Sequence, residues 1–338
     1  MAEKAFRRAL VAGGRKFGSG FIVTLDCCQH RVDKIQEEGM GMGARLQQTL
    51  ERTASLQGCG LFGGVDVTLE MCPASEGHGI VFERTDLVDP IRIPALIDYV
   101  VPRPRCTLIS HRGASVAVIE HVMAALAGMQ VDNCLVRINA PEPPACDGSS
   151  AGFVELIDRA GIVSQSAPRQ VVAVPSLMEV SESDHVGMVA LPPRGDEYEV
   201  GYLLNYGPGP IPPQAFQASV TPQSFRDELS FARTFVLEQE VKALQAQGIG
   251  LKATPQNVMV FGPQGPIENA LRAPEECARH KVLDCVGDFA LLGADISGRI
   301  TAQRSGHRLN HEFIRQLRRL TNFPALPSTK PDELRRAG

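Results

Sequence analysis

Residues 273–289 read APEECARHKVLDCVGDF and predict a helix with a chemically unusual edge. A proline followed by two glutamates is typical of a helix N-terminus, because proline fits the first turn and carboxylates favour the positive end of the helix dipole. At about 100° per residue, His280, Lys281, Asp284 and Asp288 fall on one edge, and the apolar side chains fall on the opposite side. The sequence therefore predicts an amphipathic helix with a histidine, an ammonium and two carboxylates along one edge.

This polar edge has two interpretations. Polar side chains on one side of a helix commonly face solvent, and a surface helix alone would explain the pattern. The other interpretation is a metal site, because His280 and Asp284 are four residues apart, the spacing at which two histidines on a helix can hold zinc. A single helix supplies two ligands here, so a third must come from elsewhere in the chain.

Glu120 and His121 are the candidates for completing such a site. Their predicted helix is otherwise apolar, and burying an acid next to an imidazole is costly unless both are bonded; an exposed pair at a helix edge is the alternative. Two histidines and one carboxylate would leave a fourth zinc position for water, beside a glutamate able to take its proton, as in metal-assisted hydrolysis. His307, in the sequence SGH, is expected on a loop. It could take part in the chemistry of the site, or its side chain could simply be exposed to solvent.

The composition excludes several classes of protein. At about 150 residues per domain, 338 residues predict two domains, and 43% hydrophobic with 21% charged residues predict a soluble globular chain. The net charge of −4 offers no positive field, so we expect no nucleic-acid partner. Nine cysteines without a CxxC pair or a secretory signal predict the reducing cytoplasm. No run approaches the ~20 apolar residues that span a bilayer, so we expect no membrane span.

The pattern of strands and helices predicts an α+β chain in four parts. These are an N-terminal extension without an assigned role (1–44), a first α+β domain (45–165), a second α+β domain (169–323) and a loose tail (324–338). The polar run at residues 164–168 lacks periodicity and predicts a linker. An alternative to the extension is that translation begins at Met40 or Met42. Strands are expected near 65–70, 79–82 and 134–139, and helices near 116–126, 149–161, 235–247, 274–292 and 309–320.

The order of short motifs resembles the UDP-3-O-acyl-N-acetylglucosamine deacetylase family, zinc amidases of bacterial lipid A synthesis. The resemblance extends from about Leu46 to Phe323, roughly four-fifths of the chain. The motifs are GCGLFGG (58–64), GIVFERTDL (79–87), EHVMAALAG (120–128), DN (132–133), APE (140–142), DGS (147–149), ARTF (232–235), RHKVLD (279–284), GD (287–288) and SGH (305–307). Each motif alone is weak, but together in the family's order they are specific.

The resemblance implies which residues bind the metal and start the reaction. His121, His280 and Asp284 would bind Zn²⁺, and Glu120 would be the general base. This division of labour is chemically reasonable, because zinc lowers the pKa of bound water and a nearby carboxylate collects the proton.

The resemblance also implies the groups around the substrate, a UDP-linked acylated N-acetylglucosamine. A protonated His307, hydrogen-bonded to Asp288, would stabilise the oxyanion and the leaving amine, and Thr234 would donate to the oxyanion. Lys281 and Arg304 would meet the phosphates, with Arg304 standing where the family usually has lysine. Phe235 would line the sugar or acyl site.

The family's fold implies two domains, each with layered helices on small sheets, and an active site in the cleft between them. We expect a cytoplasmic monomer. The chain departs from the family's pattern at Phe62, where histidine is usual, at Val118, where threonine is usual, and in the loop 248–254. Two alternatives therefore stay open: a zinc amidase for a different N-acyl sugar nucleotide, and a non-catalytic lipid- or nucleotide-binding paralogue.

Overall fold

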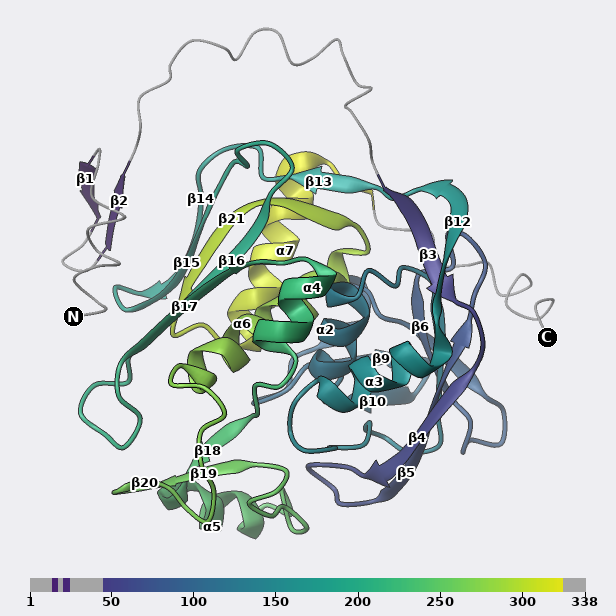
Figure 1. Ribbon diagram of the computed structural model, residues 1–338, viewed down its shortest axis with the longest axis horizontal. Helices are drawn as coiled ribbons and strands as arrows, with labels where there is room; N and C mark the ends of the chain where they lie inside the picture. Colours follow the sequence, from purple (N-terminus) through teal and green to yellow (C-terminus); the bar gives the residue numbers. More distant parts are fainter. Residues whose placement is uncertain (1–13, 18–20, 25–44, 325–338) are drawn as a thin grey trace, which may run out of the picture.

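The computed structural model describes residues 14–17, 21–24 and 45–324 (Figure 1). Strands β1 (Gly14–Phe17) and β2 (Phe21–Thr24) pair as an antiparallel hairpin inside the predicted N-terminal extension. The rest of that extension, with Met40 and Met42, and residues 325–338 of the predicted tail lie outside the described residues.

The first half of the chain builds a mixed sheet in the order β4-β5-β11-β6-β7. Its strands are β4 (Ala54–Cys59), β5 (Asp66–Pro73), β6 (Ile80–Arg84), β7 (Ile91–Pro94) and β11 (Cys134–Ile138). Alternation explains the buried face, since Val67, Leu69 and Met71 of β5 point into the core while their neighbours are more exposed. Helix α3 (Ala151–Ala160) packs on β4 and β5 and against α2 (Glu120–Gly128).

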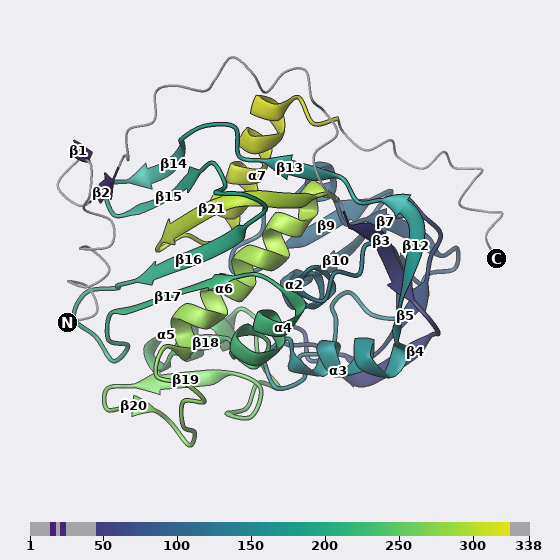
Figure 2. The same ribbon diagram turned by 45° about the horizontal axis from the view of Figure 1, so that its top comes forward.

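The second half builds a larger sheet in the order β14-β15-β21-β16-β17, with β13 paired to β21. Its strands are β13 (Val171–Ala173), β14 (Met178–Ser183), β15 (Val186–Leu191), β16 (Tyr198–Leu204), β17 (Gln214–Ser219) and β21 (Asp295–Gln303). Helix α6 (Glu276–Phe289) packs on β16 and β17, and α7 (His307–Thr321) packs on β14 and β15. Helix α6 also packs against α2, so helices of both halves lie between the two sheets (Figure 2).

Smaller elements surround this core. Strands β18 (Phe235–Leu237), β19 (Met259–Gly262) and β20 (Gly265–Pro266) form a sheet that packs with α5 (Glu238–Ala246), at the bottom of Figure 1. Strands β8 (Val100–Val101), β9 (Leu108–His111) and β10 (Ala114–Ala117) form another. Short helical turns are Ile97–Tyr99, α4 (Pro222–Ser224), Phe225–Leu229 and Ala290–Leu292. The predicted α+β class is confirmed, and the two-domain division stays a prediction.

The predicted linker at residues 164–168 is wrong. This segment belongs to strand β12 (Ile162–Pro168), which pairs antiparallel with β3 (Leu46–Leu50). Its side chains are mostly polar, so the sequence shows little hydrophobic alternation. The strand forms because groups distant in the sequence satisfy its hydrogen bonds: β3 pairs with residues 162–164 and with Pro168, and the Ser166 and Ala167 N–H groups donate to the Glu76 carboxylate.

Two predicted helix starts are also displaced. The helix expected near residue 116 begins at Glu120, because residues 114–117 form β10 and Val118 turns the chain with a positive φ of 57°. That conformation is strained for a β-branched residue. The helix expected near residue 235 begins at Glu238, because residues 235–237 pair with β19.

Helices α2 and α6 approach each other at Gly287. A Cβ atom on Gly287 would lie 2.1 Å from the Glu120 carbonyl oxygen and 3.1 Å from the Ala124 backbone nitrogen. Any side chain at this position would therefore push the start of α2 away from α6. Glycine is needed here for close approach, although it is a weak helix former.

We expect Gly287→Ala to destabilise the fold by about 1–3 kcal/mol, because overpacking outweighs the gain in helix propensity. The free energy of unfolding in urea measures this. Gly209→Ala is the matched control, because a Cβ there has nothing within 4 Å. Equal stability of Gly287→Ala and the parent would contradict the close-packing argument.

Candidate active site

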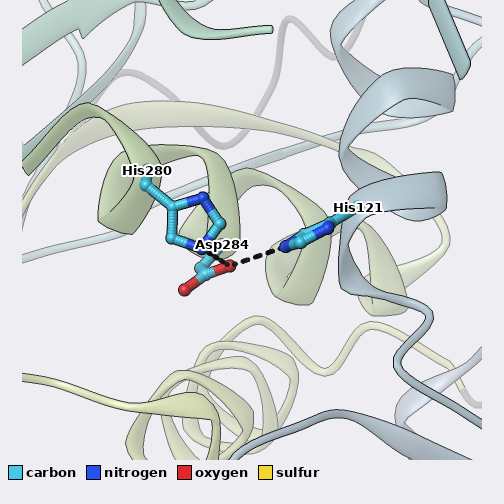
Figure 3. A group of neighbouring side chains, drawn as sticks. All are labelled: His121, His280 and Asp284. Atoms are coloured by element: carbon cyan, nitrogen blue, oxygen red, sulfur yellow. Dashed lines mark ion pairs between the residues drawn. The ribbon is translucent and has the colours of Figure 1, made fainter. Parts of the chain in front are cut away.

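Three buried side chains converge between α2 and α6 (Figure 3). His121 comes from the first turn of α2, and His280 and Asp284 come from successive turns of α6. His280 Nε2 lies 3.4 Å and His121 Nε2 lies 3.8 Å from Asp284 Oδ1. One ligand atom from each residue falls within 4.8 Å of the others. The structure therefore brings together the three residues that the sequence suggested as metal ligands.

The polar edge of α6 does not face solvent. His280, Asp284 and Asp288 are 2%, 3% and 0% exposed, so the interpretation as a surface helix is wrong. The exposed alternative for Glu120 and His121 is wrong for the same reason, since both are buried. Hydrophobic periodicity could not distinguish these cases, because the covering layer is α2, far away in the sequence.

The donor atoms suit a divalent metal ion. His280 Nδ1 lies 3.1 Å from the Ala232 carbonyl and donates to it, which leaves Nε2 with a lone pair toward Asp284. Burial, reinforced by His280, lowers the pKa of His121 to about 3, and burial also lowers the pKa of His280. Both imidazoles are therefore neutral, as metal ligands must be.

The carboxylate completes this donor set. Burial opposes ionisation of Asp284, but His280 and Lys281 outweigh it and hold the pKa of this carboxyl well below its usual range. Lys281 Nζ donates to Asp284 Oδ2 at 2.7 Å. Oδ1 is buried and has no hydrogen-bond partner among the described residues. Such an orphaned anionic oxygen, aimed at two neutral imidazoles, fits a metal ligand.

A carboxylate and an imidazole face each other beside this group. Glu120 Oε1 lies 3.7 Å from His307 Nε2. Burial raises the pKa of Glu120 to about 7, although His307 opposes the shift. Burial lowers the pKa of His307, but Asp288 and Glu120 outweigh it and raise that pKa to about 10. The pair thus combines a carboxylate of raised basicity with an imidazolium, as acid–base chemistry requires.

Asp288 supports His307 from behind. Its Oδ2 accepts from His307 Nδ1 and from Asn310 Nδ2, both at 2.8 Å, and its Oδ1 accepts from Thr107 Oγ1 at 2.5 Å. His307 is the first residue of α7 and follows Gly306, which differs from the predicted loop position. Sequence reasoning missed Asn310 and Thr107. The sequence gives no signal for Thr107, whose role comes from contacts distant in the chain.

The site opens into a cavity of about 970 Å³. Nine of the ten residues predicted for the site line it, namely Glu120, His121, Thr234, Phe235, His280, Lys281, Asp284, Arg304 and His307. The tenth, Asp288, lies behind His307 instead. Apolar side chains of α5 and β19, among them Leu244 and Val260, line another part of the cavity. A cavity with a charged part and an apolar part suits an amphiphilic ligand.

The remaining predicted residues are placed by their neighbours. Lys281 Nζ lies 5.6 Å from the centre of the Phe235 ring, and the Arg304 guanidinium lies 5.8 Å from that of Tyr206. The Thr234 backbone N–H donates to the Gly148 carbonyl at 2.8 Å, which fixes the start of β18 against the first half of the chain.

Two neutral imidazoles, a carboxylate oxygen without a partner among the described residues, and an adjacent acid–base pair define a metal-dependent hydrolase site. Residues 47–319 match the model of the UDP-3-O-acyl N-acetylglycosamine deacetylase family. The chain belongs to this family, and the resemblance predicted from its motifs is confirmed.

Similar proteins named UDP-3-O-acyl-N-acetylglucosamine deacetylase come from several bacteria. The protein of Myxococcus xanthus is 39% identical over 272 residues, which cover 80% of this chain and 86% of the relative. The protein of Geotalea uraniireducens is 38% identical, with 85% and 93% covered. That of Brucella melitensis is 36% identical, with 80% and 94% covered. Within the described residues, no helix combines the length and apolarity needed to cross a bilayer.

We expect His280→Ala to lose the bound divalent ion, because the two remaining ligands bind a metal ion much more weakly than three. The parent should retain about one ion per chain after dialysis against a weak chelator, measured by plasma mass spectrometry. His78→Ala is the control, because His78 lies at the turn before β6 and does not line the cavity. Unchanged metal content in His280→Ala would contradict the proposed ligand set.

Proposed function

We propose that this protein is a zinc-dependent deacetylase of lipid A biosynthesis. It would hydrolyse the acetamide of UDP-3-O-acyl-N-acetylglucosamine and release the free amine and acetate. The observation that carries the proposal is the buried group of His121, His280 and Asp284 beside Glu120 and His307, within the charged part of an otherwise apolar cavity. Membership of the deacetylase family supports the same reaction.

Zinc is the metal we propose, since two imidazoles and one carboxylate form a recognised catalytic zinc set with an open fourth position. When bound, zinc would supply a Lewis acid and activate water for attack. The residues His121, His280 and Asp284 would hold it. Lys281, which donates to the second oxygen of Asp284, would keep the first oxygen turned toward the ion.

Glu120 and His307 would divide the proton transfers. Water adds to the amide carbon and gives its proton to Glu120, whose raised pKa makes it a competent base near neutral pH. His307, protonated and held by Asp288, would stabilise the negative charge that develops on the amide oxygen, with Thr234 as a further donor. The carbon–nitrogen bond then breaks, and the amine leaves with a proton from these groups.

The two parts of the cavity would receive the two parts of the substrate. Lys281 and Arg304 would bind phosphate oxygens, because both are cationic and line the charged part. Phe235 and the apolar side chains of α5 would contact the sugar and the acyl chain. We propose a cytoplasmic location, consistent with the unpaired state of all seven cysteines in the described residues. The expectation of a monomer stays a prediction.

We predict that Glu120→Gln keeps its zinc and loses deacetylation by about 100- to 10,000-fold in kcat, because the amide cannot accept the proton. The assay follows acetate release from the UDP-linked substrate. Glu83→Gln is the matched control, since Glu83 is a buried carboxylate of β6 that pairs with arginines outside the cavity. Equal turnover by Glu120→Gln and the parent would make the base assignment wrong.

The same assay separates the alternative substrates. The parent is given a mixture of N-acyl sugar nucleotides, and we expect the 3-O-acylated UDP-N-acetylglucosamine to be consumed first. Preference for another member of the mixture would favour a different amidase. Zinc binding without consumption of any member would favour a non-catalytic binding protein.

We predict that His307→Ala lowers kcat by about 100- to 1,000-fold and leaves the zinc content unchanged, because His307 stabilises charge and does not bind the metal. Metal content and kcat are measured on the same preparation. Loss of zinc in His307→Ala, with His78→Ala unaffected, would contradict this role.

A further inference from the structure

Thr107 contacts both sides of the proposed reaction site. It lies just before β9, is 1% exposed, and does not line the cavity. Its backbone N–H donates to Glu120 Oε2 at 3.0 Å, and its hydroxyl donates to Asp288 Oδ1 at 2.5 Å. The other oxygen of Asp288 holds His307 Nδ1. One residue is thus bonded to the carboxylate and to the support of the imidazole.

The hydroxyl of Thr107 has a fixed orientation. Its single proton goes to Asp288, because a carboxylate only accepts. The hydroxyl oxygen lies 2.9 Å from His311 Nε2 and must therefore accept from an N–H at that nitrogen. Without the hydroxyl, Asp288 Oδ1 would keep His311 Nε2 at 3.4 Å as a much weaker contact.

Thr107 holds the rear atoms of two groups whose front atoms face each other. Glu120 Oε1 and His307 Nε2 are 3.7 Å apart, and these are the atoms that would move protons. The atoms fixed from behind are Glu120 Oε2, directly, and His307 Nδ1, through Asp288. The backbone carbonyl of Thr107 also accepts a hydrogen bond from the Ile119 backbone N–H at 3.4 Å, which connects Thr107 to the residue before α2. A shift of Thr107 would change the separation of the reacting atoms.

We propose that Thr107 is a positioning residue for deacetylation: its hydroxyl holds Asp288, and through it His307, at a set distance from Glu120. This role rests on the proposed function. Misplacement of catalytic groups by about 1 Å can cost 100-fold in rate, and loss of a supporting hydrogen bond at a metal site typically costs 10- to 100-fold.

The test compares Thr107→Val, which has the same shape without the hydroxyl, with Thr107→Ser, which restores it. In the zinc-loaded full chain, we expect Thr107→Val to lower kcat by about 10- to 100-fold, with KM and zinc content unchanged. Thr107→Ser should recover most of kcat. Thr49→Val is the matched control, because the Thr49 hydroxyl is also buried and donates to the Asn133 carbonyl at 2.7 Å, outside the cavity.

A double-mutant cycle identifies the route of the effect. If Thr107 acts through Asp288 and His307, Thr107→Val should cause no further loss of kcat in the His307→Ala enzyme. Additive losses would overturn the proposal, as would parental kcat in Thr107→Val, or equal losses in Thr107→Val, Thr107→Ser and Thr49→Val. If the valine variant does not fold, Thr107→Ala replaces it under the same criteria.

The outcomes also separate this role from the proposed function. A parent enzyme that holds zinc and consumes no substrate would overturn both. An active parent whose Thr107→Val variant is equally active would overturn the role of Thr107 alone.

Discussion

The carbonyl of Glu120, at the start of α2, lies directly against Gly287 of α6, closer than any side chain at that position would allow. This contact sets where His121 meets His280 and Asp284, because the first two turns of α2 are rigidly connected to Glu120. The helices come from opposite halves of the chain: α6 packs on β16 and β17, and α2 packs against α3, which covers β4 and β5. The three proposed metal ligands therefore converge only if this backbone contact is made.

The same close packing buries several charges, which costs free energy unless each is compensated. Asp284 is compensated by Lys281, and Asp288 by His307 with donors from Thr107 and Asn310. Asp284 Oδ1 is the exception, because it has no hydrogen-bond partner among the described residues. An exception of this kind is expected at a functional site, where a ligand supplies the missing interaction.

Part of this site could be predicted from the sequence, because it depends on local spacing. The i, i+4 relation of His280 and Asp284 is a property of one helix. Glu120, His121 and His307 are already candidates from their residue types and neighbours, and the family motifs assign their roles. Thr107 and strand β12 could not be predicted in this way, because Thr107 depends on side chains of α2 and α6, and β12 depends on β3.

Ion pairs between the halves illustrate the same limit. Arg45 and Arg169 each pair with Asp132 and Asp295, and this network connects β3, the loop after α2 and the start of β21. Neither arginine lies in a motif of the family. Asp132 follows α2 and Asp295 follows α6, so the network connects segments that leave the two helices. Residue type alone did not indicate which charges would be buried together.

X-ray absorption at the zinc edge of the zinc-loaded protein tests whether His121, His280 and Asp284 bind one ion, because it identifies the atoms bound to the metal. We predict two imidazole nitrogens at about 2.0 Å and oxygen ligands at about 2.0–2.2 Å, with no sulfur. The chain has nine cysteines, so a sulfur site is chemically available. A spectrum with sulfur at about 2.3 Å, or without the scattering pattern of two imidazoles, would contradict the convergence of His121, His280 and Asp284 on one ion.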